Sequence, residues 1–363
     1  MTILDRYLVS KYMKTFFFTV LLFSIIAVVI DFSEKLEKFI DNKVPAREVL
    51  GDYYLNYVPD INAILWPLFA LIAVVFFCSR LAKNVEFVAM FSSGLGINRL
   101  LKPFLWSSAI IMTILLIANH LLLPITNKTK LAFENKYITP QRSTPRNTSI
   151  HTFIGPDIKI FIRYYNHTDS SASDAYIERY EQGRIVEYTK IGRLKYLGKD
   201  DLWKIHDIEK YALDSANNFV VFGKKETGGQ DTTLYLRPDD FLEWKYDEKR
   251  LTTPQILTHL ERQKERGSQN VKPFKVELYR RTAEPMSILI LSLIGMAVGS
   301  KKTRGGMGVH LAVGISLGAL FVFLSKLSIS FANNPDLNPF IGVWIPNIVF
   351  GGVAWWLIKK AQQ

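Results

Sequence analysis

The residue types that most often perform catalysis are scattered along this 363-residue chain. Its six histidines show no H-E-x-x-H motif and no pair at a metal-ligand spacing. The one cysteine, Cys78, permits neither an intrachain disulfide nor a Cys-based zinc site, and we expect it to fill space inside a hydrophobic helix. Aspartate pairs at 200–201 and 239–240 are typical of solvated strand turns. The sequence thus predicts no catalytic residue, no metal site and no cofactor.

A nucleotide-binding loop is not predicted either. The nearest match to the phosphate-binding pattern G-x-x-x-x-G-K-[ST] is residues 295–303, where the spacing is wrong. This segment also ends a hydrophobic run instead of following a strand, so it is predicted to be a membrane helix with a basic stop. Any uphill transport by this chain would therefore need energy from a partner.

Long uncharged runs near both ends of the chain predict membrane spans. A bilayer core about 30 Å thick is crossed by about 20 mostly apolar helical residues. Six segments approach that length, and the first and fourth are short enough to need extension into flanking residues. They are residues 16–30, 61–78, 103–126, 285–300, 307–325 and 340–358. The predicted fold class is an α-helical polytopic membrane protein with three helices on either side of an insert.

The charges of the connecting segments predict the orientation. Residues 1–15, 79–102, 301–306 and 359–363 carry 12 Lys and Arg against two acids, whereas residues 31–60 carry four against seven. Because cytoplasmic loops are enriched in Lys and Arg, we expect both termini in the cytoplasm and the insert on the opposite side. The first group supplies +10 of the formal net charge of +12, so the basic balance reflects topology and requires no nucleic-acid partner.

The polar insert has the pattern of a β domain. Apolar and polar residues alternate over 158–164, 192–196 and 201–205, and turn residues separate these runs. Several short strands at such spacing predict a sandwich or jelly roll. A helix is expected from Pro254 to about Gly267. The predicted division is 1–126 for helices 1–3, 127–271 for the β domain with its terminal helix, and 272–363 for helices 4–6.

The predicted cytoplasmic loop 79–102 contains a short amphipathic helix, residues 83–91, which we expect Gly94 to end. Glu86 is the only acid of this loop, among four cations. Two interpretations stay open from the residues alone. The helix lies on the membrane with Glu86 paired to Lys83, or it docks in a groove of a partner protein through exposed apolar side chains. Those side chains are Phe87, Met90 and Phe91.

Six short motifs follow one another along the chain. They are L-D-R-Y at 4–7, V-P-D…W-P at 58–67, R-L-A-K-N-V-E…S-G at 80–94, E-L-Y-R-R…P at 277–285, G-G-M-G at 305–308 and W-I-P-N at 344–347. In order and spacing they resemble the YjgP/YjgQ (LptF/LptG) permeases of the lipopolysaccharide export transporter. The resemblance covers essentially the whole chain.

The resemblance implies a transport role for a protein of the bacterial inner membrane. Members of this family pair as two permeases, bind two copies of a cytoplasmic ABC ATPase, and extract lipopolysaccharide from the outer leaflet. They pass it to a β-jellyroll bridge that crosses the periplasm towards the outer membrane. The implied β insert is therefore periplasmic and jellyroll-like, and ATP hydrolysis is expected in a separate subunit, so this chain is not expected to be an enzyme.

By the motif match, residues 83–94 are the coupling helix that seats in the ATPase, with Glu86 at the family's acidic position. The expected coupling residues are Lys83, Glu86, Phe87, Met90, Phe91 and Gly94.

A lateral gate that involves spans 1 and 5 is also implied, with basic residues that bind lipid phosphates at the outer end of the first helix. Here Asp31 stands where a lysine would suit a phosphate, and Lys35 and Lys38 follow one turn later. Helix-surface pairing of these lysines with Asp31 and Glu34 is the competing interpretation. The expected gate residues are Lys35, Lys38, Arg280, Arg281 and Phe321.

Three other functions agree less well with the residues. A polytopic membrane enzyme acting on lipid-linked sugars would gather acids or histidines at one membrane surface, and the aspartates of 31–60 and 326–339 form no recognisable catalytic pattern. A scaffold that anchors a β domain would need one span. A secondary transporter would use intramembrane ionisable residues, for which His120 and His310 are the candidates.

Overall fold

The computed structural model divides the chain into two compact units. A helical unit comprises Met1–Ile138, Glu248–Thr253 and Lys272–Gln363, and a β unit comprises Thr139–Asp247 and Pro254–Val271. The residues that the structure describes are 2–139, 148–198, 201–213, 219–221, 226–234, 236–238, 247–265, 271–300, 306–334 and 336–361. The aspartate pair 239–240 and residues 301–305 of the basic stop and the G-G-M-G motif lie outside them.

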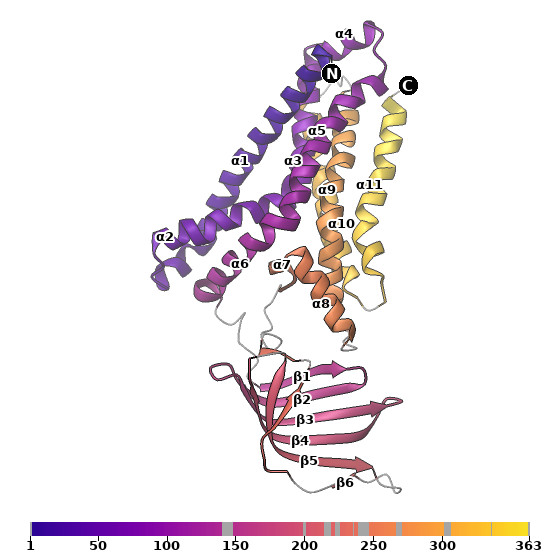
Figure 1. Cartoon of the computed structure of the whole chain (residues 1–363). Coiled ribbons are helices and arrows are strands. Elements are labelled where there is room, and N and C mark those ends of the chain that lie inside the picture. Colours follow the sequence, from indigo (N-terminus) through magenta and orange to yellow (C-terminus); the bar gives the residue numbers. More distant parts are fainter. Residues whose placement is uncertain are drawn as a thin grey trace. The chain divides into compact units, whose positions relative to one another are not determined.

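The six predicted membrane spans are confirmed as six long apolar helical segments in the described chain (Figure 1). The helices are longer than the predicted apolar runs, because polar flanking residues belong to the same helices. The bounds are α1 (Ile3–Asp41), α3 (Leu55–Lys83), α5 (Ile97–Ile117), α9 (Lys272–Gly299), α10 (Gly306–Ala332) and α11 (Pro339–Ala361). The shorter helical elements are α2 (Ala46–Glu48), η1 (Val49–Tyr54), α4 (Glu86–Ser92), η2 (Ala118–Leu122), α6 (Leu123–Phe133), η3 (Glu134–Ile138) and α7 (Asp247–Arg250).

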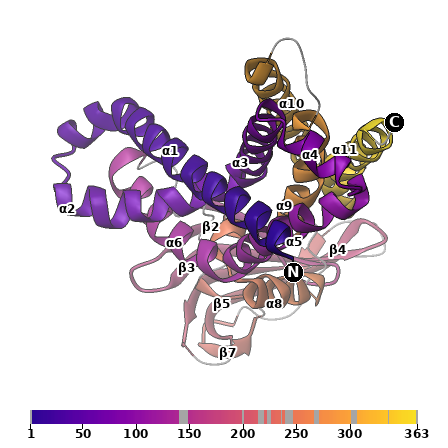
Figure 2. The same cartoon turned by 90° about the horizontal axis from the view of Figure 1, so that it is seen from above.

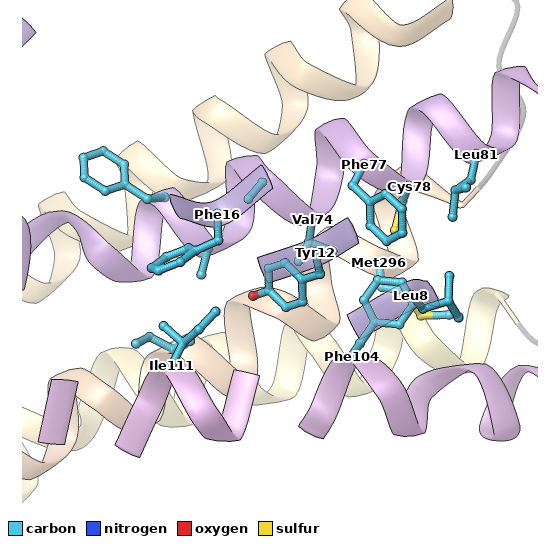
Figure 3. Packing of buried hydrophobic residues seen from close by; sticks show 14 of the residues in the cluster. Leu8, Tyr12, Phe16, Val74, Phe77, Cys78, Leu81, Phe104, Ile111 and Met296 are labelled. Atoms are coloured by element: carbon cyan, nitrogen blue, oxygen red, sulfur yellow. The ribbon is translucent and has the colours of Figure 1, made fainter. Parts of the chain in front are cut away.

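Helices α3 and α9 form the interior of the helical unit. Of their most apolar stretches 61% is buried, against 17% for α1 and 22% for α10. A glycine of α9 lets α9 approach α3 closely, because a Cβ on Gly299 would lie only 2.7 Å from Cβ of Cys78. Cys78 is fully buried there, as expected for an apolar filler. Figure 3 shows the packing around it, where Tyr12 of α1 and Phe104 of α5 meet side chains of α3.

Helices α1 and α10 pack on α3 and expose much of their apolar surface. Figure 2 shows α3 between them. In α1 the buried residues stop at Thr19 and resume at Asp31, so the stretch between them carries an uncovered apolar face. An apolar face that wide is expected to meet lipid or another apolar surface in the membrane.

The β unit is an open antiparallel sheet whose first five strands pair in chain order. The alternating runs of the sequence lie in β2, β4 and β5, and Trp203 is buried in the core with its indole N–H donating to the carbonyl of Leu236 at 2.8 Å. Strands β6 and β7 both pair with β5, near its opposite ends. The bounds are β1 (Thr148–Gly155), β2 (Ile158–Asn166), β3 (Ser171–Glu181), β4 (Arg184–Tyr196), β5 (Leu202–Leu213), β6 (Phe219–Val221) and β7 (Gln230–Thr233), followed by α8 (Thr253–Glu265). The predicted class, a polytopic helical protein with an inserted β domain, is confirmed.

Candidate functional site

The ends of the helical unit carry the two sets of candidate residues. Both chain termini and α4 lie at one end, which we call the α4 end (Figure 1). The corner between α1 and η1 and the turn between α10 and α11 lie at the opposite end. This arrangement follows from helices that run alternately up and down.

At the α4 end, Glu86 bridges α4 to α1. Its carboxylate accepts hydrogen bonds from the hydroxyl of Tyr7 at 3.1 Å and from the side-chain amide of Asn84 at 3.2 Å. The side chain of Glu86 is half-buried. The described part of the chain thus pairs Glu86 with α1 instead of with Lys83, whose exposed side chain belongs to the last turn of α3.

The backbone between α3 and α4 turns sharply. Val85 has a φ of 61°, a left-handed conformation that β-branched residues rarely adopt. This turn starts α4 at Glu86 instead of at Lys83, the start predicted from the sequence. Gly94 follows the helix with a φ of 83°, consistent with the predicted helix stop.

A second contact ties the N-terminus of α1 to α5. Arg99 donates to the carboxylate of Asp5 at 2.8 Å and to the hydroxyl of Thr2 at 3.3 Å. Thr2 and Asp5 also form the capping box that begins α1. Deeper in the unit, the hydroxyls of Tyr12 and Ser292 lie 2.7 Å apart, which joins α1 to α9. The N-terminal half of α1 is therefore fastened to three neighbouring elements.

Two residues expected on an exposed docking surface are buried. Phe87 is 2% exposed and Met90 is 8% exposed, and both belong to the main hydrophobic cluster of the helical unit. They anchor α4 to its own chain, so the prediction that they are exposed to a partner is wrong. The side chain of Phe91 lies outside the described residues.

At the opposite end, Asp31 gathers three donors. Lys35 Nζ lies 2.6 Å from its carboxylate, and the hydroxyls of Tyr53 and Tyr54 lie at 3.2 and 3.3 Å. The ammonium group of Lys35 also lies 4.6 Å from the ring centroid of Tyr53. Lys35 thus has the i,i+4 pairing that the sequence allowed as an alternative, whereas Lys38 is exposed.

Arg281 is an internal clamp. Its side chain is 1% exposed and donates to Glu277 at 3.1 Å and to Thr253 at 3.0 Å. It also donates to the main-chain carbonyls of Glu248 and Leu251, at 3.2 and 2.7 Å. All these groups belong to the chain itself, so Arg281 positions the segment at 248–253 against α9 and does not face a substrate, contrary to the sequence-based expectation.

Arg280 is also engaged, because its guanidinium lies between Glu277 at 2.8 Å and Glu284 at 2.6 Å. Lys326, on α10, is an exposed cation near Glu284, Arg280 and Asp60. Lys326 is not among the residues predicted for the site, because the apolar run of the fifth span ends one residue earlier, at Ser325. The helix continues for six residues beyond it, to Ala332.

Phe321 does not offer free acyl-chain surface. It is 5% exposed and packs edge-on against Phe350 of α11, with ring centroids 5.1 Å apart. Its ring is covered by α11, and a contact of Phe321 with substrate stays a prediction. Phe323, two residues on, is 59% exposed on the same helix.

Comparisons with known proteins agree with the resemblance. Residues 6–360 match the family described as lipopolysaccharide export system permease LptF/LptG. The lipopolysaccharide export system permease protein LptG of Escherichia coli strain K12 is 21% identical over 375 residues, covering 99% of this chain and 98% of the relative. The protein of the same name from Escherichia coli O6:H1 strain CFT073 has the same identity and coverage. In the described residues no group of three His, Cys, Asp or Glu could hold a metal ion.

Proposed function

The chain belongs to the LptF/LptG family of lipopolysaccharide export permeases, and we propose that it transmits the work of a cytoplasmic ABC ATPase dimer through α4 to a lipid path along α1. It is a multi-pass membrane permease subunit of the lipopolysaccharide export transporter. In this proposal both termini are cytoplasmic, as the distribution of Lys and Arg favours. The β unit is periplasmic, and the chain pairs with a second permease of the same family.

The observation that carries the proposal is the attachment of α4 to α1. Glu86 of α4 accepts from Tyr7 of α1, and Arg99, which follows α4, pairs with Asp5 of α1. A displacement of α4 by closing ATPase subunits therefore pulls on the N-terminal half of α1. Since Phe87 anchors α4 in the core, α4 cannot move without moving its neighbours.

The uncovered apolar faces of α1 and α10, and the exposed lysines on these helices, support the proposed lipid path. The uncovered face of α1 between Thr19 and Asp31 and the exposed face of α10 are the least buried apolar surfaces among the spans. Lys38 and Lys326 are exposed cations near the outer ends of these helices and are suited to phosphates of a lipid head group. In a pair of permeases, these faces would border the cavity that receives lipopolysaccharide.

The β unit is proposed to pass the lipid to a periplasmic jellyroll bridge. Strand β1 pairs only with β2 among the described strands, so its other edge is available for strand addition. The rival function, an enzyme acting on lipid-linked sugars, gains no support from the aspartates, because Asp31 pairs with Lys35 and Asp60 with Lys130.

Copurification tests the proposed ATPase contact. The tagged full-length chain is purified from bacterial membranes as wild type and with Glu86→Arg, and bound ATPase is quantified by mass spectrometry. Asp336→Arg, which places the same charge change at the opposite end, is the control. We expect an ABC ATPase with the wild type and the control and much less with Glu86→Arg, with equal membrane insertion of all three. Equal ATPase recovery with Glu86→Arg would refute the role of α4.

A further inference from the structure

A groove of about 470 Å³ lies between α10 and α11 at the end of the helical unit opposite to α4. Its walls are apolar side chains of both helices: Leu327 and Phe331 of α10, and Ile345 and Val349 of α11. Its volume is within the range of about 300–1,000 Å³ that is typical of small-molecule sites. The coupling path from α4 to α1 does not use this groove.

The shape of the groove is fixed by close contacts between the two helices. Ser328 and Pro346 line it and are buried, and the Ser328 hydroxyl donates to the main-chain carbonyl of Gly342. Near the turn that joins the helices, a Cβ on Gly342 would lie 2.6 Å from that of Ala332. These contacts hold α10 and α11 close together beside their connecting turn, so the groove is preformed.

The groove extends through about half of a membrane. From Leu324 to Ala332 there are eight helical steps, about 12 Å at 1.5 Å per residue, and from Pro339 to Val349 there are ten steps, about 15 Å. The hydrocarbon core is about 30 Å thick. A partner transmembrane helix would contact α10 and α11 over the full thickness, whereas a lipid of one leaflet has the length of the groove.

The mouth of the groove carries charges of both signs. Asp336 lines it and is exposed, and within the described residues its carboxylate has no ion pair. Lys272 donates to the main-chain carbonyls of Asn334 and of Leu337, the latter at 3.1 Å, so its ammonium group lies at the same turn. A zwitterionic head group complements this pair of charges, whereas a head group with several phosphates is repelled by Asp336.

We propose that this groove binds one acyl chain of an aminophospholipid, with the ammonium of the head group at Asp336 and the phosphate beside Lys272. The chemical class is that of phosphatidylethanolamine. The site includes no residue of α1 and lies between α10 and α11, where it holds a resident lipid. The proposal does not depend on the coupling of α4 to an ATPase.

Photolabelling tests this site. The full-length chain is placed in nanodiscs of phosphatidylethanolamine and phosphatidylglycerol that contain a trace of phosphatidylethanolamine with a diazirine in its acyl chain, and adducts are mapped by mass spectrometry. Val349→Trp fills the groove, and Ile348→Trp adds the same bulk to the neighbouring residue, which is 67% exposed and does not line the groove.

We expect adducts on the facing sides of α10 and α11 that fall about fivefold with Val349→Trp, equivalent to about 1 kcal/mol, and stay unchanged with Ile348→Trp. With Asp336→Lys, excess phosphatidylglycerol should compete better than in the wild type. If Val349→Trp and Ile348→Trp gave the same adduct yield, the labelling would reflect ordinary contact with bilayer lipid and not a specific site in the groove. The proposal would also be overturned if lipopolysaccharide displaced the probe. It would be overturned too if the groove of the wild type took up no probe because a second protein occupied it.

Discussion

The contact between Tyr7 and Glu86 gives the sharpest prediction. Tyr7→Phe removes one hydroxyl that donates to Glu86 at 3.1 Å and leaves the aromatic ring in place. Because the contact is largely exposed, its loss is expected to cost about 0.5–1.5 kcal/mol, the range of a net hydrogen bond in water. That cost corresponds to a factor of about 2–10 in the equilibrium that keeps α4 attached to α1.

The expected result is a transporter that hydrolyses ATP normally but moves less lipid per ATP. The assay uses proteoliposomes with the purified complex and measures lipopolysaccharide release and phosphate production in the same sample. Tyr180→Phe is the matched control, since Tyr180 donates to Glu178 at 2.8 Å within the β unit. Unchanged lipid release per ATP in Tyr7→Phe, or an equal loss in Tyr180→Phe, would refute coupling through α1.

Three further predictions follow from packing and charge. Arg281→Ala should lower the free energy of unfolding by about 3–5 kcal/mol because it breaks a buried ionic cluster, and Arg281→Lys should restore little of it, as thermal unfolding in detergent will show. Gly299→Ala should cost about 1–3 kcal/mol through overpacking against α3, whereas Gly352→Ala, which has open space around it, should cost less in the same measurement. The double variant Lys38→Ala/Lys326→Ala should reduce lipopolysaccharide-stimulated ATPase activity more than basal activity. Equal loss of both activities would indicate a structural role for these lysines.

The membrane part of the fold could be predicted from the sequence because hydrophobic length and loop charge act locally. The six spans and the inserted strands each depend on a run of neighbouring residues. The ends of the helices could not be read in this way. Lys326 was placed outside the fifth span because an apolar run ends at Ser325, but hydrogen bonding continues α10 to Ala332.

The candidate site was harder to predict because its contacts join segments distant in sequence. The apolar face of α4 has the same pattern whether it meets a partner or its own chain, and Phe87 in fact packs into the core. The sequence alone allows Arg281 to be a phosphate ligand, but in the structure its guanidinium donates to main-chain carbonyls of the segment 248–253. Lys35 and Lys38 both had a local signal, their i,i+4 spacing to Asp31 and Glu34. The pairing of Lys35 with Asp31 is present, whereas Lys38 is exposed.

The most direct test of the central claim is photocrosslinking of lipopolysaccharide to α1 in the reconstituted transporter, before and after addition of ATP. A photoreactive amino acid replaces Ile25, which is 56% exposed in the middle of the uncovered face of α1, and buried Leu8 provides the control position. We predict that lipopolysaccharide crosslinks at position 25 without ATP, that the crosslink decreases during ATP turnover, and that Tyr7→Phe slows this decrease. A crosslink at position 25 that is absent, or that does not respond to ATP, would contradict a lipid path along α1 driven through α4.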